Sequence, residues 1–106
     1  MFATNSIASP AFSILVPVHN AGGFLRLAVQ SVLSQTCSEF ELIVIDDGST
    51  DGCLDSLAGV EDDPRVCILR QSRQEAPGAL NAGLQIARGE WIALVAQKPA
   101  SKRNVA

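Results

Sequence analysis

The chain has 106 residues, of which 47% are hydrophobic and 18% are charged. This length allows a single domain, and the composition is that of an ordinary globular protein, which excludes the disordered and collagen-like classes. Eight basic and eleven acidic residues leave a net charge of −3, which argues against nucleic acid as a partner because binding a phosphate backbone needs a basic face.

The first half of the chain predicts a strand, a helix and a second strand. Residues 13–18 (SILVPV) are rich in β-branched side chains and predict a buried strand that ends at the polar loop HNAGG. Residues 40–45 (FELIVI) predict a second strand, and residues 49–51 of the DDGSTDG segment after it are candidate helix N-caps. Between the strands, apolar residues at three- and four-residue steps predict a helix that packs on a sheet: Leu25, Ala28, Val29, Val32 and Leu33.

The second half continues this alternation. A short apolar face at residues 54–58 precedes a third strand, predicted at residues 66–69. Pro77 suits the first turn of a helix that ends at Gly89. Residues 91–95 predict a fourth strand, buried like the others. The positions expected to line the apolar face of the helix are Leu80, Leu84 and Ala87.

Strands that are apolar throughout and alternate with helical connections are typical of a parallel sheet covered on both faces. The sequence therefore predicts an α/β fold, with a Rossmann-like sheet of about four parallel strands and helices on both faces, which is half of a doubly wound domain. We expect this domain over residues 12–96, between an N-terminal flank (1–11) and a tail (97–106) that has three basic residues and no acidic one.

Neither a membrane segment nor a metal cluster is indicated. The apolar runs are far shorter than the roughly 20 residues that span a bilayer. Residues 1–12 have no basic start and no long apolar segment, so we expect a cytoplasmic protein without a secretory signal. Cys37, Cys53 and Cys67 are odd in number and have no CxxC spacing, and the chain has a single His. We therefore expect reduced, packed thiols rather than a disulfide framework or a zinc site.

The carboxyl ends of the predicted strands are where an open α/β sheet binds ligands. His19 follows the first strand, and Asp46 and Asp47 follow the second, so an imidazole and two acids would share one rim. Adjacent residues in an extended segment point to opposite sides, so one Asp is expected to brace the loop and the other to face a ligand. Two plainer interpretations stay open: DDGSTD is only a turn with helix caps, and His19 is only a structural hydrogen-bonding residue.

Several segments together carry a resemblance to a known family: SILVPVHNAGGFL, SVLSQT, FELIVIDDGSTDG, DPRV and ALNAGLQIARGEWIALV. In this order and spacing they resemble the nucleotide-binding half of the family 2 glycosyltransferases, which have the GT-A fold. The similarity covers residues 12–95. It implies that the chain binds a nucleotide-diphosphate sugar, most often of uridine type, and is related to enzymes that transfer the sugar to an acceptor hydroxyl.

The resemblance also implies roles for individual residues. His19 stands where the family commonly has a Tyr that packs on the base, and Asp47 matches the acid that accepts a hydrogen bond from the base. Pro17 lies where the backbone contacts the nucleoside, whereas Leu80 replaces a frequent Arg and so weakens a phosphate or packing contact. The implied nucleotide-binding set is Pro17, Val18, His19, Asn20, Asp46, Asp47 and Gly48.

The resemblance breaks down at the family's metal motif. Its Asp-x-Asp carboxylates hold a Mg or Mn ion that neutralises the departing nucleoside diphosphate, but the matching positions here are Ala96, Gln97 and Lys98. The acceptor site and the catalytic base of the family lie further along the chain. We therefore expect a truncated fragment that binds nucleotide and transfers no sugar, with no catalytic residue or cofactor of its own; Mg or Mn is expected only in a full-length member. The alternative is a non-catalytic module that self-associates through the exposed edge of the fourth strand, where Trp91 adds apolar area.

Overall fold

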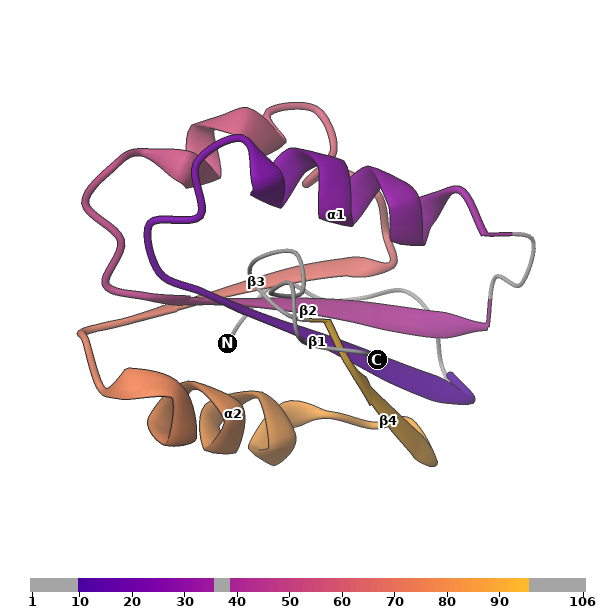
Figure 1. Cartoon of the computed structure of the whole chain (residues 1–106). Helices are drawn as coiled ribbons and strands as arrows, with labels where there is room; N and C mark the ends of the chain where they lie inside the picture. The colour runs from indigo at the N-terminus through magenta and orange to yellow at the C-terminus, as the bar shows by residue number, and fades with distance from the viewer. Residues whose placement is uncertain (1–9, 36–38, 96–106) are drawn as a thin grey trace, which may run out of the picture.

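The computed structural model describes residues 10–35 and 39–95, which form a four-stranded sheet with helices on both faces (Figure 1). All strand pairs are parallel, and the order across the sheet is β3-β2-β1-β4, so the predicted α/β fold is confirmed. No helix in these two ranges is long and apolar enough to cross a membrane. The elements in chain order are β1 (Phe12–Val18), α1 (Phe24–Leu33), β2 (Phe40–Asp47), the 3-10 helix η1 (Cys53–Leu57), β3 (Val66–Gln71), α2 (Glu75–Ile86) and β4 (Trp91–Leu94).

Strand β2 is one of the two central strands of the sheet, beside β1, and all of its residues are buried. In Figure 1, α1 and η1 cover one face of the sheet and α2 covers the other. Successive side chains of β2 enter opposite cores, which explains why residues 42–45 are all apolar rather than alternating. The core beside α1 and η1 contains Val16, Val18, Leu25, Val29, Phe40, Leu42, Val44, Cys53, Leu57 and Val66. The core beside α2 contains Leu15, Ile43, Ile45, Cys67 and Ala79.

Strands β2 and β3 each extend two residues beyond their predicted ends. Their pairing continues past the last apolar residues, with Asp46 opposite Arg70 and Asp47 opposite Gln71. Hydropathy marks where a strand stops being apolar, whereas backbone pairing decides where it ends. The two acids are therefore held by the sheet itself and not by a loop.

The prediction that the fourth strand is buried is wrong. Strand β4 pairs with β1 at the edge of the sheet, and each of its residues is exposed, with Trp91 at 64%. An apolar run predicts burial only if another element covers it, and helix α2 packs on β1 and β2 instead.

The prediction that Leu84 faces the core is also wrong, because its side chain is 44% exposed. Helix α2 instead turns Ala79 and Gly83 toward the sheet, and both are buried. A Cβ on Gly83 would lie only 2.8 Å from Cδ1 of Ile45. The helix approaches the sheet through its small residues, and Leu84, the next residue along, points away.

None of residues 49–51 is the N-cap of η1, contrary to the prediction, although Asp51 Oδ1 accepts a bond from Cys53 N at the start of η1. The N-cap of η1 is Gly52, which has a φ of 72° and forms no side-chain cap bond. The side chains of residues 49–51 all bind the loop that follows β1. A capping pattern in the sequence cannot distinguish a local partner from one about 30 residues away.

Two of the three cysteines, Cys53 and Cys67, are free and buried, as expected for packed thiols. Burial raises the pKa of the Cys67 thiol, and the nearby carboxylate of Glu41 raises it further. Cys37 lies outside the described residues, as do the predicted tail and the metal-motif positions Ala96, Gln97 and Lys98.

A buried carboxylate fixes the path from α2 to β4. Glu41 in β2 is 3% exposed and accepts hydrogen bonds from Ser13 Oγ at 2.5 Å, from Arg88 N at 2.6 Å and from Arg88 Nε at 3.2 Å. Ser13 Oγ in turn accepts a bond from Gly89 N at 2.7 Å. This network joins β1, β2 and the segment after α2, so it sets where β4 begins beside β1.

Candidate functional site

The carboxyl ends of β1, β2 and β3 form one rim, at the left of the sheet in Figure 1. Three loops leave this rim, after Val18, after Asp47 and after Gln71. The rim brings His19 next to the acid pair, because His19 Nδ1 lies 3.1 Å from the backbone oxygen of Asp47. Residues 28 positions apart in the chain thus meet at the edge where parallel sheets bind ligands.

Asp46 and Asp47 leave β2 on opposite faces of the sheet, as adjacent residues of a strand do. Asp46 lines a cavity beside η1, on the α1 face. Asp47 contacts the segment that precedes α2 on the other face. Their side chains therefore cannot act together on one bond.

The carboxylate of Asp47 is enclosed by hydrogen-bond donors. Oδ1 accepts from Gln71 Nε2 at 2.9 Å and from Gln74 N at 2.8 Å, and Oδ2 accepts from Arg73 Nη1 at 3.2 Å. The Asp47 side chain is 4% exposed, whereas that of Arg73 is 46% exposed. Asp47 therefore braces the loop between β3 and α2, and Arg73, whose side chain is nearly half exposed, contacts it from the rim.

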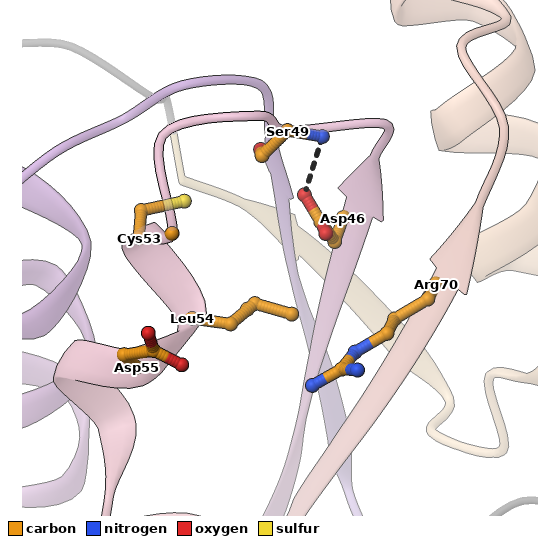
Figure 2. Close-up of a pocket in the computed structure, with 7 residues that line it drawn as sticks. Asp46, Ser49, Cys53, Leu54, Asp55 and Arg70 are labelled. Atoms are coloured by element: carbon orange, nitrogen blue, oxygen red, sulfur yellow. Dashed lines mark hydrogen bonds between the residues drawn. The ribbon is translucent and has the colours of Figure 1, made fainter.

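The carboxylate of Asp46 faces an open cavity of about 330 Å³ (Figure 2). Oδ1 of Asp46 accepts a bond from Ser49 N at 3.2 Å. Arg70, the register partner of Asp46 on β3, extends its guanidinium into the cavity toward Leu54. Within residues 10–35 and 39–95, Arg70 forms no ion pair. The cavity is lined by Asp46, Ser49, Gly52, Cys53, Leu54, Asp55 and Arg70.

The loops after β1 and β2 are joined mainly by the side chain of Asn20. Its Oδ1 accepts bonds from Thr50 N at 2.7 Å and from Asp51 N at 3.2 Å. Its backbone nitrogen donates to Ser49 Oγ at 2.9 Å, and its Nδ2 lies 3.3 Å from His19 Nε2. The two loops therefore form one unit that includes the His19 ring.

Asp51 adds a second connection between the same loops. Its Oδ2 accepts from Gly22 N at 3.0 Å, and its Oδ1 accepts from Cys53 N at 3.0 Å. Desolvation acts to raise the pKa of Asp51, but the hydrogen bonds from Cys53 and Gly22 outweigh it and hold this pKa below its ordinary value. The ionised carboxylate is thus the form that fits the loop.

The other residues of the implied nucleotide-binding set differ in how much of each residue is accessible to a ligand. Val18 is 1% exposed and packs in the core, so only its backbone is within reach. Pro17 is half-buried opposite Ile45, and Gly48 is half-buried where β2 ends. The sequence did not indicate Arg73 and Gln74 as partners of Asp47, because they lie beyond the end of β3 and meet Asp47 only through the pairing of β2 with β3.

The side chains of residues 10–35 and 39–95 do not fit a metal site. Among the described residues, no group of three or more His, Cys, Asp or Glu side chains could hold a metal ion. The positions that the sequence resemblance assigns to a metal motif, Ala96, Gln97 and Lys98, lie outside the described residues, and the side chains of Ala and Lys offer no oxygen ligand for Mg²⁺ or Mn²⁺. No step of a reaction is therefore assigned to a metal bound by this chain.

Comparison with known proteins matches this chain to one family. The sequence model described as "Glycosyl transferase family 2" matches residues 13–96. The "PGL/p-HBAD biosynthesis glycosyltransferase" of Mycobacterium tuberculosis is 36% identical over 88 residues, which cover 81% of this chain and 34% of that protein. "Glycosyltransferase GlyG" of Streptococcus pneumoniae is 36% identical over 99 residues, which cover 92% of this chain and 33% of that protein. The chain thus spans about a third of the length of these curated relatives.

Solved structures with the same fold include TarS of S. aureus, residues 1–349, in complex with UDP-GlcNAc. It superposes with a TM-score of 0.73 and 26% identity, over 81% of this chain and 26% of that one. The mannosyltransferase PcManGT from Pyrobaculum calidifontis, in complex with GDP-Man and Mn²⁺, has a TM-score of 0.75 over 90% of this chain and 29% of that one. Its identity of 22% supports the fold alone.

Proposed function

The chain belongs to glycosyl transferase family 2, and on this premise we propose that its sheet rim binds the nucleotide part of a nucleotide-diphosphate sugar of uridine type. Family membership confirms the resemblance drawn from the sequence motifs. The proposal is supported by TarS, which shares the fold over 81% of this chain and has been solved with UDP-GlcNAc and with UDP. For the whole protein, we propose transfer of the sugar from such a donor to an acceptor hydroxyl.

The observation that carries the proposal is the contact between His19 and Asp47 at the adjacent ends of β1 and β2. A planar ring offers a base a stacking surface, and a carboxylate offers the base N–H a charge-assisted acceptor. Asp47 is the last residue of β2 and His19 directly follows β1, so both are held by the central strands and binding requires little ordering of the chain. We assign the base to this pair.

Binding of a base at Asp47 requires that one hydrogen-bond donor to its carboxylate be replaced by the base. The Asp47 oxygens already accept bonds from Gln71, Arg73 and Gln74. The Arg73 bond is the one to be replaced, because it is the longest of the three and its side chain is 46% exposed. Gln71 and Gln74 then keep the carboxylate in place while the base N–H takes the position of the guanidinium.

We propose that this chain binds nucleotide without help from a divalent metal and transfers no sugar by itself. The proposal rests on the absence of carboxylates at Ala96, Gln97 and Lys98, where the family's Asp-x-Asp motif would lie. Catalytic and acceptor-binding residues are assigned to the parts of the relatives that this chain does not match, which are about two thirds of their length. The cytoplasmic location expected from the sequence stays a prediction.

Self-association through β4 is a second candidate role. Trp91, Ile92 and Leu94 are 64%, 45% and 58% exposed on a strand at the edge of the sheet. An edge strand with exposed apolar side chains is a ready surface for pairing with a second copy. Sedimentation at rising concentration should reveal a dimer that Ile92→Lys disrupts, and a monomer at all concentrations would exclude this role.

An amide NMR titration of the chain with UDP tests the main proposal. We expect the resonances of His19, Asp47 and Arg73 to shift, with the same affinity in the presence and absence of Mg²⁺. A titration with ADP separates base recognition from a general affinity for diphosphate, and UDP should bind more tightly. Absence of shifts at the rim would contradict the proposal, and a large gain in affinity with Mg²⁺ would contradict its metal-free part.

A further inference from the structure

The side chain of Asn20 contacts both the loop after β2 and the His19 ring, and its two ends have different chemistry. The Oδ1 end faces the backbone N–H groups of Thr50 and Asp51, at 2.7 and 3.2 Å. Backbone N–H groups only donate hydrogen bonds, so the atom that faces them must be the amide oxygen. The orientation of the Asn20 amide is thereby fixed, and its NH₂ group points to His19.

The orientation of this amide determines which nitrogen of His19 carries the proton. Asn20 Nδ2 is 3.3 Å from His19 Nε2, and an NH₂ group can only donate, so Nε2 must accept with its lone pair. The other nitrogen, Nδ1, lies 3.1 Å from the backbone oxygen of Asp47, which can only accept. Nδ1 must therefore carry the hydrogen. Both contacts select the same neutral tautomer, Nδ1–H, whereas an unconstrained neutral histidine favours Nε2–H.

Backbone geometry explains why an Asn stands at this position. Asn20 has a φ of 54°, and it is the only residue other than Gly with a positive φ in the described ranges. Asn and Asp adopt this left-handed conformation more readily than other residues with a side chain. Of these two, only Asn has both an oxygen for the Thr50 and Asp51 amides and a donor for His19.

We propose that Asn20 is a positioning residue that locks the loops after β1 and β2 together and holds the His19 ring in one plane as the Nδ1–H tautomer. Both ends of its side chain are used within the protein, so Asn20 acts on a ligand through His19 and not by direct contact. The consequence for a bound base rests on the proposed nucleotide binding, since a ring held in one plane is a preorganised stacking surface.

Imidazole nitrogen NMR tests this directly, because the chain contains one His and, without a histidine tag, gives a single set of ring signals. At a pH where the ring is neutral, we expect a pyrrole-type signal for Nδ1 and a pyridine-type signal for Nε2. In Asn20→Asp, one carboxylate oxygen still accepts from the amides of Thr50 and Asp51, but the other faces Nε2 as an acceptor. The proton should therefore move toward Nε2.

Asn20→Gly is the matched second variant, because Gly tolerates the positive φ and removes both ends of the side chain. The population of the Nδ1–H tautomer should fall in the order wild type, Asn20→Gly, Asn20→Asp. Hydrogen exchange at the amides of Thr50 and Asp51 should stay slow in Asn20→Asp and become fast in Asn20→Gly. A residue that only stabilises the fold would not give the largest tautomer change in Asn20→Asp and the largest exchange change in Asn20→Gly.

The inference is overturned if the wild-type ring is mainly the Nε2–H tautomer, or if the three proteins share one tautomer distribution. In an unfolded chain the His19 ring would also be mainly the Nε2–H tautomer, and this result would count against the inference. These readouts need no nucleotide, so they can succeed even if UDP does not bind. If UDP binds, we expect its affinity to fall several-fold in Asn20→Asp although the loops stay joined, because an Nε2–H ring no longer donates to the backbone oxygen of Asp47 and so loses the contact that holds its plane.

Discussion

The backbone nitrogen of Arg73 would lie 2.9 Å from a Cβ placed on Gly48, whose φ is +77°. The loop after β3 thus lies directly against the end of β2, which is why Arg73 and Gln74 can reach the Asp47 carboxylate. Only Gly fits here, both because of the positive φ and because of the close approach of backbone.

Gly48→Ala should therefore destabilise the protein by about 3 kcal/mol, since left-handed strain of about 1–2 kcal/mol adds to a displaced backbone. Gly59→Ala is the matched control, because Gly59 has a φ of +88° but nothing within 4 Å of an added Cβ. Gly59→Ala should be destabilised by the left-handed strain alone, by about 1–2 kcal/mol. Urea unfolding measures both variants, and equal losses would show that the contact with Arg73 does not constrain the fold.

Removing the charge of Glu41 should weaken the connection between α2 and β4. A Gln at this position turns an NH₂ group toward Arg88 or Ser13, where the carboxylate accepts three hydrogen bonds. We expect Glu41→Gln to cost about 2 kcal/mol, the range for buried hydrogen bonds to a charged group. Glu61→Gln, on an exposed residue, should change the free energy of unfolding by less than about 0.5 kcal/mol. Equal effects of the two changes would contradict the role of this network.

The two acids at the end of β2 should differ in their effect on nucleotide binding. Asp47→Asn removes the proposed charge-assisted acceptor for the base and should weaken UDP binding about 10-fold or more. Asp46→Asn, on the opposite face, should weaken it by less than about 3-fold. Calorimetry measures the affinities, with the exposed Asp62→Asn as a control of equal charge change. A larger loss for Asp46→Asn would place the base in the cavity beside η1 instead.

Acid stability should depend on Asp63. Hydrogen bonds from Arg65 hold the pKa of Asp63 below its ordinary value of 3.8. A lowered pKa in the folded state means that the unfolded state binds more protons between the two pKa values. The stabilisation is therefore complete above the unfolded pKa and is lost as the pH falls through the folded pKa.

Asp63→Asn should accordingly make stability less dependent on pH below about pH 5. Its cost at neutral pH should stay near 1 kcal/mol, because the pair is partly exposed and screened by solvent. Urea midpoints across this pH range measure the effect, and Asp62→Asn serves as the neighbouring control. An acid dependence that Asp63→Asn leaves unchanged would show that the pair with Arg65 does not contribute.

The order of elements, the parallel sheet and the position of the candidate site followed from the sequence alone. The apolar runs that became β1 and β2 lie at the centre of the sheet between helices on both faces, which is the arrangement that such runs favour. Polar residues placed directly after those runs, such as His19 and Asp47, then had to lie at the carboxyl edge, because parallel strands end together.

Only the tertiary structure decided which apolar side chains are buried and which polar groups form hydrogen bonds with one another. Leu94 and Leu84 are as apolar as core residues, yet both are exposed, because α2 packs on β1 and β2 through small residues such as Gly83. Asp47 and Asn20 take partners 24 to 31 positions away, and no local pattern encodes such pairs. The sequence by itself determined which segments could form the sheet, whereas the packing of those segments determined which side chains face water, a ligand or one another.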